Sequence, residues 1–303
     1  MLSKRSRNDK TIANDKTAAI INWYPGHMAK GKRHMENDLK LVDIIIEILD
    51  ARAPKSSRNP DLSDITRGKK PHVLVLNKAD LADEVANKKW LAYYRSAGYE
   101  AVAVNAAQKQ GIKDILAAIK RAAEPLMQKL EAKGRLRRPV RAMVVGIPNS
   151  GKSTFINAVS PMAVTKTGNK PGITKGRQWV KTAVGIELLD TPGVLWPKLS
   201  GYDIAFKLAV IGSISDLVYP LEGVATDLAD LLLQRNPDSL VARYKLEQIP
   251  DNGHQLIHDI GLKRGLLASG GAVREQDAAL LLLLEFRAGL LGRYTLDEIR
   301  SDE

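Results

Sequence analysis

The 303-residue chain contains no cysteine, few aromatic residues and no long apolar run. The absence of cysteine excludes disulfides, thiolate zinc sites and cysteine nucleophiles. The longest apolar stretch, Ala278 to Leu284, is far shorter than the ~20 residues that span a bilayer, so we expect no membrane-spanning segment. The aromatic residues, 5% of the chain, are not interleaved with basic residues as in surfaces that stack single-stranded nucleic acid.

Positive charge, by contrast, is in excess. The chain has 46 lysines and arginines against 34 aspartates and glutamates, which gives a net charge of +12. This excess predicts an anionic partner such as nucleic acid, a nucleotide or a membrane surface, although a solvated basic surface is the alternative. An apolar fraction of 44% and a charged fraction of 26% are ordinary for a folded protein, and they exclude a disordered or collagen-like chain.

Apolar runs that alternate with helical stretches predict an α/β domain with a mostly parallel sheet. The β-branched runs are nearly continuous, as in strands buried on both faces. The expected strands are 41–49, 72–76, 101–104, 140–145 and 186–189, and the expected helices between them are 84–97, 112–130 and 151–159.

The remaining chain predicts two further parts. After residue 198 only helices are expected, at 202–210, 224–233, 254–262 and 276–291. Residues 1–22 are polar and basic, which indicates a flexible arm, with a mitochondrial transit peptide as the alternative. We therefore expect an arm (1–22), an α/β domain (23–198) and a small all-helical domain (199–303).

Residues 146–154, Gly-Ile-Pro-Asn-Ser-Gly-Lys-Ser-Thr, match the phosphate-loop pattern G-x-x-x-x-G-K-[ST]. They lie between an expected strand and an expected helix, where backbone N–H groups and the helix N-terminus attract phosphate. Lys152 is expected to reach the β- and γ-phosphates and the Ser153 hydroxyl to bind Mg²⁺. The nucleotide-binding residues expected in this loop are Asn149, Ser150, Gly151, Lys152, Ser153 and Thr154.

Asn77-Lys78-Ala79-Asp80 directly follows an expected strand and matches the guanine-reading pattern N-K-x-D. One carboxylate can accept both N1–H and the N2 amine of guanine, which suits Asp80, whereas adenine would leave it unpaired. The alternative is that Asp80 only caps a helix. Asn77 would tie the base loop to the phosphate loop, and the Lys78 stem would cover the ring. After the next strand, Asn105 and Ala106 could offer a backbone N–H to guanine O6.

Asp190-Thr-Pro-Gly193 follows an apolar stretch and fits the D-x-x-G pattern. About 40 residues after the phosphate loop, Asp190 is expected on the Mg²⁺ side and Gly193 as the γ-phosphate sensor. Between these motifs, Thr174 lies in a basic loop, where its hydroxyl could close over Mg²⁺ when the triphosphate is bound.

The motifs occur in an unusual order. Ras-like GTPases run from the phosphate loop through D-x-x-G to N-K-x-D, whereas this chain places N-K-x-D first. The pocket can still close in space, because each motif follows the carboxyl end of a strand. The sequence therefore predicts a circularly permuted GTPase domain.

The chain closely resembles the YlqF/RbgA family of ribosome biogenesis GTPases. The resemblance depends on Asn22-Trp-Tyr-Pro-Gly-His-Met-Ala-Lys30, Asp50-Ala-Arg-Ala-Pro54 and the permuted motifs, and it covers nearly all residues from Asn22 onward. It implies GTP binding and hydrolysis in late assembly of the large ribosomal subunit. It also implies rRNA contact by the C-terminal helical domain. We expect a cytoplasmic monomer that binds GTP or GDP and the subunit precursor, not a membrane.

Hydrolysis needs an aligned water, and Val194 stands where Ras-like enzymes have glutamine. The resemblance points to His27 as the catalytic residue, with a structural or RNA-contacting histidine as the alternative. Asn149 suggests bound K⁺ beside the phosphates, or only a fixed loop. Two other functions stay open: a GTP-gated rRNA-binding module with negligible hydrolysis, and a phosphate-loop ATPase or kinase.

Overall fold

The computed structural model describes residues 36–60, 62, 70–161, 178–190 and 201–299. The chain divides into two compact units. Within the described part of the chain, one unit contains residues 36–190 with their gaps together with residues 294–299, and the other contains residues 201–293. Among the described residues, no helix is long and apolar enough to cross a membrane.

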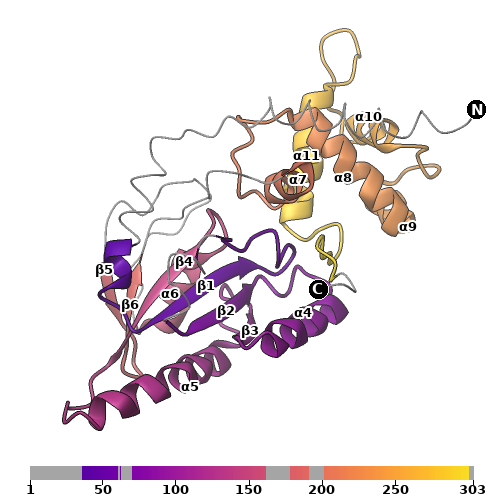
Figure 1. Ribbon diagram of the computed structural model, residues 1–303. Helices are drawn as coiled ribbons and strands as arrows, with labels where there is room; N and C mark the ends of the chain where they lie inside the picture. The colour runs from indigo at the N-terminus through magenta and orange to yellow at the C-terminus, as the bar shows by residue number, and fades with distance from the viewer. Residues whose placement is uncertain (1–35, 61, 63–69, 162–177, 191–200, 300–303) are drawn as a thin grey trace, which may run out of the picture. The chain divides into compact units, whose positions relative to one another are not determined.

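The first unit is built on a six-stranded sheet in the order β3-β2-β1-β4-β6-β5 (Figure 1). Five strands run parallel and β5 is antiparallel to β6 at one edge. This confirms the expected α/β class and the mostly parallel sheet. The strands are β1 (Ile44–Asp50), β2 (His72–Asn77), β3 (Glu100–Val104), β4 (Val140–Gly146), β5 (Gln178–Lys181) and β6 (Ile186–Asp190).

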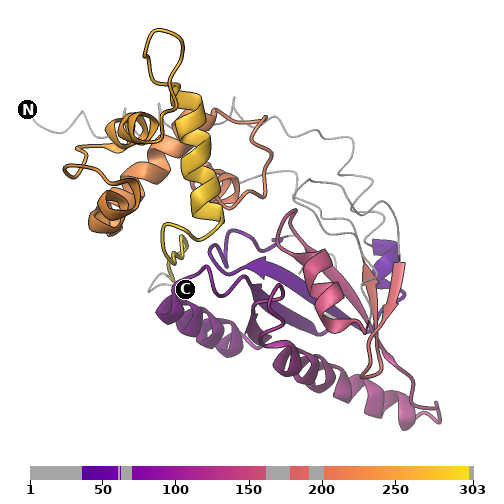
Figure 2. The ribbon, with the colours of Figure 1, turned by 180° about the vertical axis from the view of Figure 1, so that it is seen from behind.

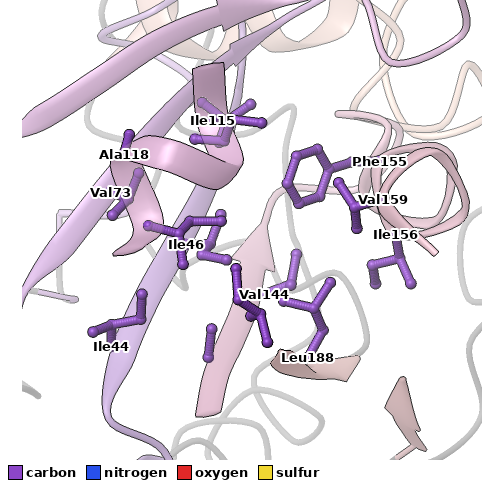
Figure 3. Close-up of a cluster of buried hydrophobic side chains, with 14 of the residues drawn as sticks. Ile44, Ile46, Val73, Ile115, Ala118, Val144, Phe155, Ile156, Val159 and Leu188 are labelled. Atoms are coloured by element: carbon purple, nitrogen blue, oxygen red, sulfur yellow. The ribbon is translucent and has the colours of Figure 1, made fainter. Parts of the chain in front are cut away.

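Strand β1 lies at the centre of the sheet and is buried along its whole length. Because successive side chains point to opposite faces, Ile44 and Ile46 join one core cluster and Leu49 joins another. The first cluster packs α5 (Ile112–Glu131) and α6 (Lys152–Val159) on the sheet, as Figure 3 shows. The second packs α4 (Glu84–Ser96) through its aromatic side chains. Seen from behind, α6 lies over the sheet (Figure 2).

The second unit is helical. Helix α8 (Leu221–Arg235) supplies fully buried leucines to its core, and Leu282 and Leu283 of α11 do the same. Its helices are α7 (Tyr202–Val210), α8 (Leu221–Arg235), α9 (Pro237–Tyr244), α10 (Gly253–Lys263) and α11 (Glu275–Arg287). The predicted all-helical character is therefore observed over the described part of this unit.

The chain returns to the first unit after Arg293. The backbone N–H of Tyr294 donates to the Leu81 carbonyl (3.2 Å), and that of Leu296 donates to the Arg52 carbonyl (2.7 Å). The Asp297 carboxylate accepts from the Ser56 hydroxyl and from two backbone N–H groups of the loop after β1. The helical domain predicted to end at 303 therefore extends too far, because these contacts hold the last residues against the sheet unit.

Candidate nucleotide-binding site

The carboxyl ends of the central strands meet at one edge of the sheet. Asp50 of β1 is level with Asn77 of β2, and Asn77 is level with Val104 of β3. On the other side of β1, Gly146 of β4 is level with Ile48. The N-K-x-D motif and the phosphate loop therefore begin on the two strands that flank β1, which is the place where ligands bind in open α/β sheets.

Two glycines shape the phosphate loop between β4 and α6. A Cβ on Gly146 (φ +154°) would lie 2.5 Å from the Ile48 carbonyl oxygen. A Cβ on Gly151 (φ +92°) would lie 2.2 Å from Nδ2 of Asn77. Because any side chain would collide at either position, only glycine allows the loop to approach β1 and the N-K-x-D motif this closely.

Lys152, the first residue of α6, is buried within this loop. Its ammonium donates to the carbonyl oxygens of Gly146 (3.0 Å) and Ile147 (2.7 Å). Burial lowers the pKa of Lys152 to about 8, and the positive charge of Lys78 adds to this effect, whereas Asp190 opposes it. A buried ammonium with a lowered pKa favours an anionic ligand, since the ligand would restore the stability of the charged form.

Asn77 joins three loops. Its Nδ2 donates to the carbonyl of Ser150 in the phosphate loop (2.8 Å), and its Oδ1 accepts from the backbone N–H of Ala106 (3.1 Å). Asn105 is itself buried and accepts from the Gln108 N–H, which closes the turn after β3. One side chain therefore holds the phosphate loop, the N-K-x-D motif and the Asn105–Ala106 turn together.

Lys78 and Asp80 differ in what they contact. The Lys78 ammonium donates to the Asn149 carbonyl in the phosphate loop (2.7 Å) and to Asp50 (3.0 Å). Asp80 is partly buried, and in the described part of the chain no hydrogen bond or ion pair engages its carboxylate. This leaves both Asp80 oxygens able to accept from a ligand.

Asp190 and Ser153 lie on the phosphate side of the site. Asp190 ends β6, is buried, and acts on the charge of Lys152, whereas Ser153 and Thr154 follow Lys152 in the first turn of α6. The described residues contain no group of three or more histidine, aspartate or glutamate side chains that could hold a metal by themselves. A hydroxyl and a carboxylate are nevertheless the donors that suit Mg²⁺ when nucleotide phosphates and water complete its octahedron.

Three expected site residues, His27, Thr174 and Gly193, lie outside the described residues, as does Val194. The structure adds two residues to which the motifs assigned no role. Asp50 and Arg52 are both buried at the end of β1, between the two halves of the site. Both belong to the Asp50–Pro54 motif on which the family resemblance depends, and that motif was the available signal.

Comparison with known proteins shows which family carries these motifs. A family model described as "50S ribosome-binding GTPase" matches residues 141–236, so its match begins only in β4, as a permuted chain requires. Ribosome biogenesis GTPase A of Bacillus cereus is 43% identical over 278 residues, which cover 92% of this chain and 94% of that protein. The chain belongs to the ribosome biogenesis GTPase A family. Its sheet unit is accordingly a circularly permuted GTPase domain.

More distant proteins give the same result. The ribosome biogenesis GTPase A of Thermotoga maritima is 32% identical over 91% of this chain and 94% of that protein. The mouse mitochondrial ribosome-associated GTPase 1 is 33% identical over 92% of this chain and 90% of that protein. The crystal structure of GNP-bound YlqF from T. maritima superposes with a TM-score of 0.61 at 27% identity, covering 89% of this chain and 98% of that one.

Proposed function

We propose that the protein binds and hydrolyses GTP and acts late in assembly of the large ribosomal subunit. In this proposal it binds the precursor particle with GTP and leaves after hydrolysis. The observation that carries it is the position of Asn77, which hydrogen-bonds both Ser150 and Ala106. This contact supports a single guanine-nucleotide pocket made from motifs in reversed order, and the names of the relatives support the cellular process.

Guanine recognition belongs to Asp80. Its two carboxylate oxygens match the adjacent N1–H and N2 amine of guanine. The turn of Asn105 and Ala106 is expected to face O6, but its N–H groups already donate within the protein, to the Gln110 carbonyl and to Asn77 Oδ1. Adenine offers neither donor to a carboxylate, so an ATPase or kinase would leave Asp80 unpaired. The stem of Lys78 would cover one face of the base.

Phosphate binding belongs to the loop before α6. Lys152 would exchange the carbonyl oxygens of Gly146 and Ile147 for phosphate oxygens, and Gly151 would let backbone N–H groups face them. Ser153, Asp190 and Thr174 would hold Mg²⁺, which when bound neutralises charge between the phosphates. Gly193 would sense the γ-phosphate.

Hydrolysis requires a water aligned with the γ-phosphate. Val194 cannot hydrogen-bond a water, so we assign that role to His27, whose neutral imidazole can orient or deprotonate it. The intrinsic rate is then low and rises when the ribosomal particle is bound. K⁺ held by Asn149 would add positive charge beside the phosphates, and faster turnover in KCl than in NaCl would be its sign.

The charge is distributed unevenly along the chain. Residues 1–198 contain 36 lysines and arginines against 18 aspartates and glutamates, whereas residues 199–303 contain 10 against 16. The first part therefore carries a net +18 and the second a net −6. We assign the salt-sensitive contacts with rRNA phosphates mainly to the first part, and any rRNA contact of the helical domain to hydrogen bonding and shape. A cytoplasmic monomer fits this function.

A second function has one observation in its favour. Val194 is consistent with a GTP-gated rRNA-binding module whose hydrolysis is negligible. Adding purified large subunits to a GTPase assay separates the two functions, since only the enzyme gains turnover. The His27→Ala variant should keep nucleotide affinity and lose most of the stimulated rate, and unchanged turnover would remove His27 from the mechanism.

Co-sedimentation with ribosomal subunits tests the proposed cycle. We expect the protein to pellet with large-subunit particles in the presence of GTP or a non-hydrolysable analogue and to stay in the supernatant with GDP. Equal pelleting in all nucleotide states would contradict the proposal.

A further inference from the structure

We propose that Asp50 is a positioning residue of the nucleotide site, holding the Lys78 ammonium across the junction between the base-reading and phosphate-binding loops. The proposal rests on the proposed guanine-nucleotide function and assigns a role to the first residue of the Asp50–Pro54 motif, which was given none above. Asp50 occupies the carboxyl end of β1, and β1 lies between β2, which precedes Lys78, and β4, which precedes the phosphate loop.

The Asp50 carboxylate is fully buried and bound on two sides. Arg52 approaches it with Nε on Oδ1 (2.9 Å) and Nη2 on Oδ2 (2.8 Å), a bidentate arrangement that fixes the carboxylate plane. Lys78 Nζ donates to Oδ2 at 3.0 Å. Burial alone would raise the pKa of Asp50, but Arg52 and Lys78 outweigh it and hold the pKa below its usual range, so the group stays ionised.

Lys78 passes this constraint to the phosphate loop. The same ammonium donates to the Asn149 carbonyl at 2.7 Å. Lys78 (φ 59°) and Asn149 (φ 58°) both have left-handed backbone conformations, which are uncommon for residues other than glycine and persist where surrounding contacts hold them. The hydrogen bonds from Lys78 to Asp50 and to Asn149 supply such contacts to Lys78 and Asn149. Asp50 therefore fixes the position of the base-reading loop relative to the phosphate loop without a ligand.

The loop that carries Arg52 is anchored separately from the nucleotide site. The Asp50 N–H donates to the Ser57 hydroxyl (3.1 Å), and the Arg52 carbonyl accepts from the Leu296 N–H. Asp297 binds Ser56 in the same loop. Because these contacts hold the loop in place, Arg52 is a rigid partner for Asp50. The protein itself therefore sets the position of the Lys78 ammonium, whether or not a ligand is bound.

A double-mutant cycle in GDP affinity tests the proposal. Because Asp50→Asn keeps the shape and removes the charge, we expect the GDP Kd to rise by about tenfold. Lys78→Met should weaken GDP binding by a similar factor, and adding Asp50→Asn to it should change the Kd by less than about twofold, because the two groups act as one unit. Two results would overturn the proposal: a wild-type GDP Kd in Asp50→Asn, or a Kd in the double variant that rises by the product of the two single-variant factors.

Glu47→Gln is the matched control. Glu47 lies in the same strand, is equally buried, and contacts the backbone of Asn59 and the Arg58 side chain. Among the described residues, no hydrogen bond or ion pair joins it to the nucleotide-binding motifs. This variant should keep the wild-type GDP affinity even if its stability changes. A wild-type protein that fails to bind GDP would refute the proposed function itself, which distinguishes the two failures.

Asp50→Asn leaves the Arg52 charge buried with less compensation, which can prevent folding. The variant that combines Asp50→Asn with Arg52→Gln removes both charges and keeps polar groups at both positions. If this variant folds and binds GDP as tightly as wild type, Asp50 does not position Lys78. The proposal is supported if this variant binds GDP about tenfold more weakly than wild type, and if the same two substitutions have no further effect when added to Lys78→Met.

Discussion

At the scale of single residues, Lys152 links proton binding to nucleotide binding. Its pKa of about 8 without ligand means that its charged fraction falls from about nine-tenths at pH 7 to about one-quarter at pH 8.5. Since phosphate binds the charged form, we expect GDP affinity to fall about fourfold over this range, with proton uptake on binding at pH 8.5. Calorimetry in two buffers of different ionisation enthalpy measures that uptake, and its absence would contradict the assignment.

Glu47 makes a prediction about stability. Burial raises its pKa to about 7, against the hydrogen bond from Asn59 and the charge of Arg58. Between pH 4.5 and pH 7 the folded protein therefore keeps this proton, whereas the unfolded chain has lost it. The stability that the protonated Glu47 contributes is fully present below about pH 4.5 and is lost as the pH rises through 7. Glu47→Gln should gain stability relative to wild type between pH 5 and pH 8, by up to about 3 kcal/mol.

Urea unfolding of both proteins across this pH range measures the difference. Burial, with a further contribution from the charge of Arg58, lowers the pKa of His72 to about 4. Because the unfolded chain binds this proton first, the protein loses stability from His72 as the pH falls, whereas it loses stability from Glu47 as the pH rises. His72 is present in both proteins and cancels from the comparison to first order. A difference that does not change with pH would show that Glu47 is ionised in the folded state throughout.

Residue identity alone indicated much of the site, because phosphate loops and N-K-x-D motifs require particular side chains at fixed spacing. Asn77, Lys78 and Lys152 do lie at one sheet edge in the structure. The sequence could not indicate that Asp50 binds Lys78, since that contact depends on which strands are neighbours. It also could not indicate that Lys152 donates to the carbonyls of its own loop.

At the scale of elements, two were missed for different physical reasons. Strand β5 is four residues long, lies at the sheet edge and carries lysine at its end, so its pattern resembles a loop. Helix α9 begins at Asn236–Pro237, between the helices expected at 224–233 and 254–262, where no helix was predicted. In the structure the Asn236 side chain accepts from the Ser239 N–H and Pro237 occupies the first turn, which is a helix start.

The Asn236 cap can be tested directly. Asn236→Ala removes the acceptor for the Ser239 N–H, so we expect the helical unit to lose about 1 kcal/mol of stability. Urea unfolding followed by far-UV circular dichroism provides the measurement. Gln248→Ala, at an exposed position, should change stability by less than about 0.5 kcal/mol. Equal effects of the two substitutions would argue against the cap.

At the scale of the whole molecule, the order of the strands explains how a reversed set of motifs makes one site. Strand β1 pairs with both β2 and β4, so the base-reading and phosphate-binding loops emerge on its two sides. Pattern and motif order together predicted this permuted sheet. They did not predict that Tyr294–Ile299 returns to the sheet unit, because that segment has no strand or helix periodicity and is held by individual hydrogen bonds.

The return of the chain gives the helical unit two covalent connections to the GTPase domain. One follows the D-x-x-G motif, and the other leads to Tyr294 and Leu296, which bind the loops after β2 and β1. Both connections therefore follow or contact segments next to the nucleotide-binding motifs.

The central claim is that Asp80 and Lys152 bind the base and the phosphates of the same guanine nucleotide. Xanthine has a carbonyl where guanine has the N2 amine, so Asp80→Asn should raise the Kd for GDP about 100-fold and make XDP the tighter ligand. Asp83→Asn, three residues away at the exposed N-cap of α4, should leave both affinities unchanged. Equilibrium titration of Asp80→Asn with GDP and XDP is the most direct test: a switch to XDP is the predicted result, and wild-type GDP affinity would contradict the account.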